Sequence, residues 1–291
     1  MMRILLFLAT NAAILIVISI IFNLLGLSSA LDAQGVNLNL NTLLFMSAII
    51  GVSGSVVSLA MSKWSAKNSM GVHVIEQPQN QTERWLLDVV TRQAQAAGIG
   101  MPEVGIFDNP TPNAFATGMN RNSALVAVST GLLHHMNADE VEAVIGHEMT
   151  HVSNGDMVTM ALMQGVVNTF VYFFATLIGH VVDRTVFKTE RGYGPAYYIV
   201  QMLAQVALGF LASMLVMWFS RYREFKADAG GAKLAGRQKM IHALQALQRG
   251  HDAEALPGQL AAFGITGGGI SRLFMSHPPL EERIAALQNN V

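Results

Sequence analysis

Four stretches of the chain contain no Asp, Glu, Lys or Arg, and each is long enough to cross the apolar core of a bilayer as a helix. They are Ile4–Leu27, Thr42–Ser62, Val158–Val182 and Pro195–Phe219. The composition agrees, because 52% of the residues are hydrophobic, only 13% are charged and the mean hydropathy is +0.39. Backbone amides inside a bilayer must be satisfied within the protein, which favours helices for such segments. We expect an α-helical membrane protein with four transmembrane helices.

Alternative assignments exist for the first stretch and for the last two. The first stretch is also compatible with a signal peptide, because Ser28–Ala30 resembles a cleavage site. Its length and the second apolar stretch that follows at once favour an uncleaved anchor. The last two stretches form a hairpin that either crosses the bilayer fully or re-enters it beside protein.

The polar residues divide the chain into four parts. We expect an N-terminal transmembrane hairpin at 1–67, a polar segment at 68–157, a second hairpin at 158–220 and a second polar segment at 221–291. An even number of spans places both polar segments on one side. The connection between the first two spans lacks basic residues, so the positive-inside rule places it outside the cytoplasm. The loop of the second hairpin contains basic residues and follows this rule only in part. The basic residues near the ends of the spans are Arg3, Lys63, Lys67, Arg184, Lys188, Arg191, Arg221, Arg223 and Lys226.

The first polar segment has the pattern of a small α+β domain. Short apolar runs separated by Gly and Pro predict strands at 72–76, 104–107, 113–117 and 124–128, and a helix is expected over 82–97 with Gly98 as its stop. Asn137 and Glu140 have the spacing of a capping box, which begins a further helix. The apolar face of that helix is Val141, Val144 and Ile145.

That helix carries His147-Glu148-Met149-Thr150-His151, an H-E-x-x-H motif. On a helix the two histidines lie one turn apart on one face, so both imidazoles can bind one zinc ion. Glu148 is then placed to take a proton from a zinc-bound water molecule. The alternative is a polar helix whose histidines face solvent or each other. We expect one Zn²⁺ per chain, with His147 and His151 as ligands and Glu148 as the catalytic base.

A catalytic zinc site needs a third protein ligand. The chain has no cysteine, so this ligand is His, Asp or Glu. The extended motif of the metzincins is absent, because Asn154 and Met157 stand where that motif has Gly and His. The best candidate is Glu224, with Asp228 one helical turn later to accept the free ring N–H of a ligating histidine. Taken alone, this pair is also typical of a solvated helix face.

These residues and the apolar hairpin between them resemble the HtpX group of membrane zinc peptidases, relatives of the CAAX prenyl proteases. The resemblance extends over nearly the whole chain and includes Asn113–Gly118 and Ser276–Pro279. It implies a gluzincin-like α+β zinc peptidase domain that cleaves damaged or misassembled membrane proteins in bacterial envelope quality control. We therefore expect a multi-pass protein of the bacterial inner membrane, with both termini and the catalytic domain in the cytoplasm.

The resemblance also implies that 113–118 is an edge strand that pairs with extended substrate. Asn113, Ala114 and Phe115 would then border the cleft, although Asn113 also fits a residue that only stabilises a turn. His277 either donates to the developing oxyanion or shapes the cleft, and a purely structural role is the alternative. The partners expected are protein or peptide substrates and the lipid bilayer, and the net charge of −1 argues against nucleic acid.

Three other classes of protein share parts of this pattern. A zinc transporter would need its ligands along a transmembrane path, and the H-E-x-x-H helix is too polar to span a bilayer. A catalytically inactive metal-binding scaffold or chaperone would normally have lost Glu148 or a ligand, and the chain retains all of them. A di-iron carboxylate enzyme needs two E-x-x-H elements, and the chain offers one at Glu148–His151.

Overall fold

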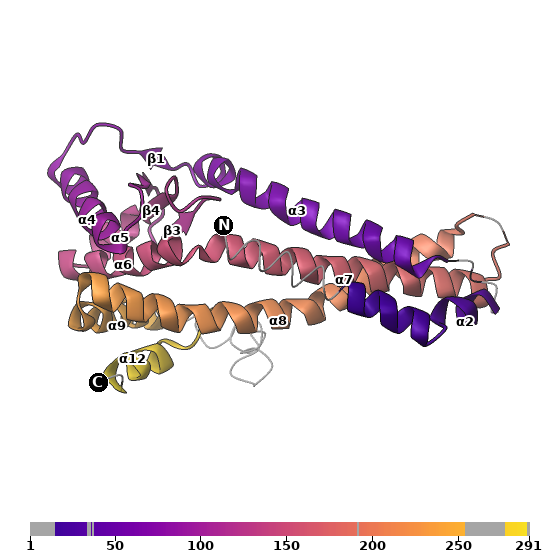
Figure 1. Cartoon of the computed structure of the whole chain (residues 1–291). Coiled ribbons are helices and arrows are strands. Elements are labelled where there is room, and N and C mark those ends of the chain that lie inside the picture. The colour runs from indigo at the N-terminus through magenta and orange to yellow at the C-terminus, as the bar shows by residue number, and fades with distance from the viewer. Residues whose placement is uncertain (1–14, 34–35, 37, 191, 254–276, 290–291) are drawn as a thin grey trace. The chain divides into compact units, whose positions relative to one another are not determined.

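The computed structural model describes residues 15–33, 36, 38–190, 192–253 and 277–289 (Figure 1). The chain divides into two compact units, one formed by 1–57 and 161–216 and the other by 58–160 and 217–291. The sequence places the first boundary ten residues later, at 67 instead of 57. The difference arises because three long helices run without a break from one unit into the other.

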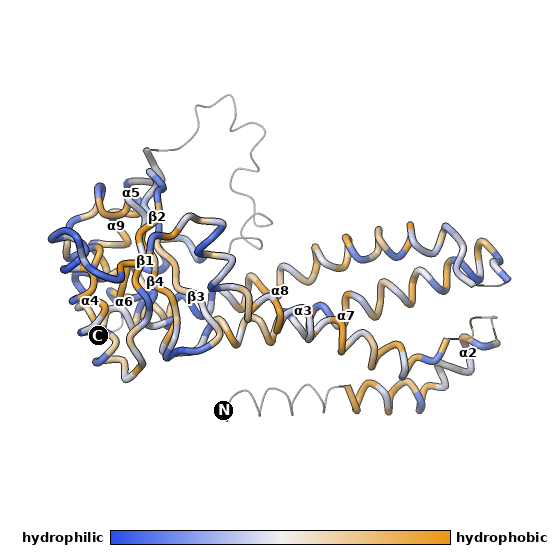
Figure 2. Tube along the Cα trace, turned by 90° about the horizontal axis from the view of Figure 1, so that it is seen from above, coloured by the Kyte–Doolittle hydropathy of each residue, from blue (hydrophilic) through white to orange (hydrophobic). Residues whose placement is uncertain are grey.

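Three helices of the described residues are long and apolar enough to cross a membrane: α3 (Leu40–Ser69), α7 (Asp156–Thr185) and α8 (Pro195–Ala235). They contain the second, third and fourth expected spans. Apolar residues follow these helices along most of their length, whereas hydrophilic residues gather in the connecting loops and in the second unit (Figure 2). Of the first expected span, residues 4–14 lie outside the described residues, and the described remainder, Leu15–Leu24, is an apolar helix.

Small residues hold α3 and α7 close together inside the first unit. A Cβ atom on Gly51 would lie 2.6 Å from the backbone nitrogen of Thr169, and one on Gly165 would lie 2.6 Å from Ser55 Oγ. Close backbone approach of this kind replaces the hydrophobic driving force that helices lack inside lipid. Phe22 stacks on Phe173 of α7 with ring centroids 5.5 Å apart, and α2 (Leu27–Ala33) follows Phe22 in the chain.

A four-stranded sheet forms one layer of the second unit, in the order β1-β2-β4-β3. The strands are β1 (His73–Val74), β2 (Glu103–Phe107), β3 (Ala114–Thr117) and β4 (Leu125–Ser129). β2 and β4 pair in parallel, while β1 and β3 are antiparallel to their neighbours. All five residues of β4 are buried, as a central strand requires. β3 is therefore an edge strand, as expected, and no strand among the described residues pairs with its outer side.

Helices pack on this sheet and on one another to form the core. They are α4 (Gln81–Ala97), α5 (Thr130–His135), α6 (Ala138–Asn154), α9 (Arg237–Ala253) and α12 (Leu280–Asn289). α6 contacts α4, α9 and the edge strand β3, and α12 packs on α9. Fully buried side chains at the centre include Leu86, Ile145 and Leu244. The helix expected over 82–97 is confirmed, with Gly98 at φ 64° as its C-cap.

The ends of α6 are fixed by local signals. The Asn137 side chain accepts from the Glu140 backbone N–H, and the Glu140 carboxylate accepts from the Asn137 N–H, so the expected capping box is confirmed. Gly155 ends the helix at φ 65°, a conformation that costs glycine little. Because the helix is interrupted at this one residue, Asp156 begins α7 close to the last turn of α6, and its carboxylate reaches His151.

Glycines also allow the last turns of α8 to approach α6 closely. A Cβ atom on Gly231 would lie 2.9 Å from the His147 backbone nitrogen, and one on Gly230 would lie 2.2 Å from Thr150 Cγ2. Distances this short exclude any larger residue without a shift of the backbone. The two glycines lie within two turns after Glu224 and within one turn after Asp228, so they bring both carboxylates to the histidines of α6.

Candidate metal centre

α6 presents His147 and His151 one turn apart on the same side, as the motif predicts. Their Nε2 atoms lie 3.1 Å from each other, and the two rings meet edge to face with centroids 4.7 Å apart. His147 is buried and His151 is partly buried. Two neutral imidazole nitrogens that converge on one point are the arrangement a transition-metal ion requires.

Glu224 of α8 completes a three-residue cluster. Its Oε2 atom lies 3.4 Å from His147 Nε2, and its Oε1 atom lies 3.3 Å from His151 Nε2. Ligands about 2.0–2.1 Å from a tetrahedral zinc ion are separated from one another by about 3.3 Å. The two Nε2 atoms and the Glu224 carboxylate, which faces one histidine with each of its oxygens, lie at separations close to this value, so these three residues could hold one metal ion such as zinc.

A buried carboxylate stands behind each histidine. His147 Nδ1 lies 2.9 Å from Asp228 Oδ1, and His151 Nδ1 lies 2.6 Å from Asp156 Oδ2. A carboxylate can only accept, so each Nδ1 carries a proton, and each Nε2 faces the cluster. The structure thus pairs Asp228 with His147, and it adds Asp156 as the equivalent partner of His151.

Two arginines in turn hold these carboxylates. Arg283 of α12 is buried and donates to Asp228 twice, from Nε at 2.7 Å and from Nη2 at 2.6 Å. Arg223 donates from Nη1 to the Asp156 backbone carbonyl at 3.2 Å and lies 3.7 Å from its Oδ2. Bidentate pairing fixes the plane of the Asp228 carboxylate and so the orientation of the His147 ring.

Sequence reasoning did not single out Asp156, Arg223 or Arg283 as site residues. Asp156 lies beyond the glycine that ends the motif helix, so helical spacing does not connect it with His151. Arg283 is 55 residues from its carboxylate partner, so no local periodicity connects the two.

Charges around the cluster shift the pKa values of its groups. Burial opposes the charged form of His151, but its hydrogen bonds with Asp156 and Glu224 outweigh this and raise the pKa to about 9. His147 is affected in the same way, since burial is outweighed by Asp228 and Glu224 and the pKa rises. Burial raises the pKa of the Glu148 carboxyl, partly offset by His147 and His151, which suits a group that must accept and return a proton.

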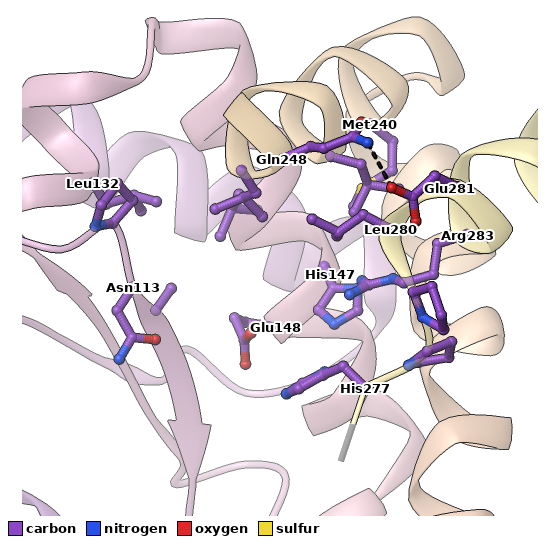
Figure 3. Close-up of a pocket in the computed structure, with 17 residues that line it drawn as sticks. Asn113, Leu132, His147, Glu148, Met240, Gln248, His277, Leu280, Glu281 and Arg283 are labelled. Atoms are coloured by element: carbon purple, nitrogen blue, oxygen red, sulfur yellow. Dashed lines mark hydrogen bonds between the residues drawn. The ribbon is translucent and has the colours of Figure 1, made fainter. Parts of the chain in front are cut away.

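A cavity of about 680 Å³ opens beside the cluster and contains the side chains of Asn113, His147, Glu148 and His277 (Figure 3). Glu148 lies between Asn113 at the edge of the sheet and His277, which precedes α12. Ala114 also lines the cavity, whereas Phe115 is not among its described lining residues and packs against Phe107 with centroids 5.4 Å apart. His277 is largely exposed, and its Nδ1 lies 2.7 Å from Glu224 Oε2.

The partner of His151 leads to a first prediction. Asp156→Asn keeps an acceptor oxygen and a good first-turn residue for α7, but it removes the charge that fixes the ring. Zinc affinity should fall about 10- to 100-fold, the usual effect of changing such a partner. The measurement is a competition titration with a chromogenic chelator.

The matched control for this variant is Asp88→Asn, on the exposed side of α4, which should leave the affinity unchanged. An unchanged affinity in Asp156→Asn as well would show that Asp156 does not orient His151.

The site combines a helix that carries two histidines and a glutamate, a carboxylate from a second helix, and an adjoining cleft beside a sheet edge. This combination is typical of the class of metalloproteases. The sequence model of peptidase family M48 matches residues 80–291. The chain belongs to this family and is a metalloprotease.

Relatives of similar length share most of the sequence. The chain is 64% identical to protease HtpX of Thioalkalivibrio sulfidiphilus and 62% identical to a protease HtpX homologue of Nitrosomonas europaea, over 99% of both chains in each case. The resemblance to the HtpX group is thereby confirmed. The fold of the chain is similar to that of Ste24p of S. mikatae, with a TM-score of 0.64 and a sequence identity of 18%. The match covers 93% of this chain and 66% of Ste24p.

Proposed function

We propose that the protein is an integral-membrane zinc endopeptidase that cleaves misfolded or damaged membrane proteins at the cytoplasmic face of the bacterial inner membrane. The observation that carries this proposal is the tetrahedral spacing of His147, His151 and Glu224 next to Glu148 in one open cavity. His151 lies five residues before α7 begins at Asp156, and Glu224 follows the apolar part of α8, so both residues flank the expected second hairpin.

We propose that His147, His151 and Glu224 hold the zinc ion. When bound, zinc would supply a Lewis acid that polarises the scissile carbonyl and lowers the pKa of a water molecule. Glu148 would take the proton of that water and return it to the leaving amine. Asp228 and Asp156 would keep the two imidazoles in the tautomer that leaves Nε2 free.

β3 would hold the substrate in extended conformation. The Ser129 N–H donates to the Asn113 carbonyl, so 113, 115 and 117 bond inward to β4. The N–H and C=O groups of Ala114 and Ala116 therefore point to the free edge of the sheet. A substrate strand added there would place its backbone alongside Glu148, and only an unfolded or locally extended chain can present such a strand.

The proposal is tested with the full chain in detergent micelles. An unfolded model protein should be cleaved, cleavage should stop after treatment with a chelator, and it should return when one equivalent of zinc is added. Mass spectrometry of the fragments should show internal cuts rather than trimming from an end. Zinc-loaded enzyme that cleaves neither this protein nor an unfolded membrane protein would contradict the proposal and favour a metal-binding scaffold.

The proposed orientation gives a separate prediction, which exploits the absence of cysteine from the chain. Arg121→Cys lies on an exposed loop of the second unit, and Glu190→Cys lies on the exposed loop between α7 and α8. In intact bacterial cells with a permeabilised outer membrane, an impermeant maleimide should label Glu190→Cys and leave Arg121→Cys unlabelled. After cell lysis both should react, and the reverse pattern in intact cells would overturn the orientation.

A further inference from the structure

The positions where the apolar stretches meet polar sequence define the side of the second unit that faces the bilayer. These positions are Ser62 on α3, Val158 on α7 and Phe219 on α8, and all three belong to the second unit. On α3 the change is abrupt, since Lys63 follows the apolar stretch directly. The parts of the second unit that contact this first charged turn of α3 therefore lie close to the level of the lipid headgroups.

The loop between β3 and β4, residues 118–123, is held at this level by α3. Lys63 Nζ donates to the Ser123 backbone carbonyl at 2.9 Å, and it lies 2.9 Å from a carboxylate oxygen of Glu103, the first residue of β2. Lys67, one helical turn later, pairs with the same carboxylate. The charged turn of α3 thus contacts the end of the sheet at which β2 begins and β3 ends.

Hydrogen bonds within the loop fix its shape. Asn120 Oδ1 accepts from the Asn122 N–H at 2.9 Å, and the Ser123 N–H donates to the Asn120 carbonyl at 3.0 Å. The Gly100 N–H donates to Asn122 Oδ1 at 3.0 Å, which connects the loop with the segment before β2. Asparagine turns of this kind order a loop locally, so its outward side chains keep defined positions.

The outward side chains have the chemistry of a membrane surface. Met119 in this loop, Met101 in the segment before β2 and Trp64 on α3 are exposed large hydrophobic residues. Arg121 is exposed and forms no ion pair with any other residue that the structure describes. Tryptophan prefers the boundary between lipid and water. A long basic side chain can lay its alkyl part on lipid and keep its charged group at the phosphates, where water still reaches it.

We propose that the loop at 118–123 is a membrane-contact site, which inserts Met119 among the lipid headgroups and places the Arg121 guanidinium on the phosphate of an anionic phospholipid. The partner is the leaflet that the protein's own spans enter on this side. Anionic lipids of such a leaflet attract basic groups that lie close to its surface. The two lysines of α3 share a single carboxylate, so they add positive charge at the same place.

The consequence of this contact for catalysis rests on the proposed function, although the contact itself does not. β3 runs from Ala114, which lines the cavity of the metal centre, to Thr117, which precedes the loop. A loop seated on lipid would place the far end of the sheet edge where membrane proteins emerge from the bilayer. An extended substrate segment would then meet β3 directly after it leaves the lipid.

The contact is tested with single-cysteine variants, since the chain has no cysteine of its own. Full-length Met119→Cys, labelled with the environment-sensitive fluorophore NBD, is reconstituted into nanodiscs of phosphatidylethanolamine and phosphatidylglycerol. Its emission should shift to the blue, and lipids with a doxyl quencher near the headgroup should quench it as strongly as they quench labelled Trp64→Cys. The matched control is His134→Cys, exposed on α5 beyond the opposite end of β4, which should stay unquenched.

Charge reversal tests the anionic headgroup. When Arg121→Glu is added to labelled Met119→Cys, the ratio of lipid-bound to water-exposed loop should fall about fivefold or more, the factor expected for loss of one basic group near an anionic surface. Nanodiscs of phosphatidylcholine alone should lower the quenching in the same direction. Arg84→Glu makes the same change of charge on the exposed first turn of α4 and should leave the quenching unchanged.

Equal zinc content per chain shows that each variant has folded. A Met119 probe as exposed to water as the His134 probe would overturn the proposal. So would protection from aqueous iodide without quenching by doxyl lipids, because a protein surface would then cover the loop. Quenching that Arg121→Glu leaves unchanged would exclude the phosphate as the partner of Arg121. None of these readouts uses proteolysis, so a failure of the proposed function is distinguished from a failure of the contact.

Discussion

Glu148→Gln should lower kcat by about 10²- to 10⁴-fold while the protein keeps one zinc ion per chain. The amide has the shape of the carboxyl group but cannot take the proton of the attacking water. The group is partly buried beside His147 and His151, and no other described carboxylate that lines the cavity lies on the motif helix. Activity on an unfolded protein and zinc content by atomic emission should be measured on the same preparation.

The control for this variant lies on the same helix. Asp139→Asn changes an exposed carboxylate in the first turn of α6, where it pairs with Lys239, and should leave kcat within about twofold. Retention of more than half of the wild-type rate in zinc-loaded Glu148→Gln would contradict the assignment of Glu148 as the base.

The second large effect is expected from Glu224→Ala. This change removes the only carboxylate that lies within 3.4 Å of both imidazole Nε2 atoms among the described residues. Substitution of a residue that hydrogen-bonds to a metal ligand typically lowers metal affinity about 10- to 100-fold, and loss of the ligand itself should lower zinc affinity further. Activity should then be lost at limiting zinc. A competition titration measures the affinity, and activity is then followed as zinc is added.

Lys226→Ala provides the matched control, since this exposed residue lies on the same helix two positions later and contacts the Tyr222 ring. It should bind zinc as the wild type does. If Glu224→Ala retained wild-type affinity at one zinc per chain, the ligand set proposed here would be wrong.

Much of the fold could be read from local patterns. The helix over 82–97 and the start of the motif helix at the Asn137 capping box follow from periodicity, caps and turn residues, whereas the edge position of the strand near Ala114 was implied only by the family resemblance. These signals act between residues close in the chain, so they survive without knowledge of the tertiary structure. The expected spans were shorter than the helices observed, because α3 and α8 continue into the polar unit where hydropathy no longer marks them.

The site was only partly accessible to the same reasoning. His147, Glu148 and His151 lie within five consecutive residues, so helix geometry alone groups them. The prediction of Glu224 as a ligand depended on an assumption about where a distant helix returns. Which histidine Asp228 contacts became known only from its hydrogen bond with His147. Asp156 and Arg283 became visible only through their hydrogen bonds.

By itself the sequence determined that this chain carries long apolar helices and a motif helix with converging histidines, because both depend on spacing along one helix. The tertiary structure alone decided that Gly230 and Gly231 let α8 close onto α6, that each histidine has a carboxylate behind it, and that an apolar cavity adjoins Glu148. The contact between His147 and Asp228 alone joins residues 81 positions apart. Such contacts depend on the packing of whole elements, for which no local pattern exists.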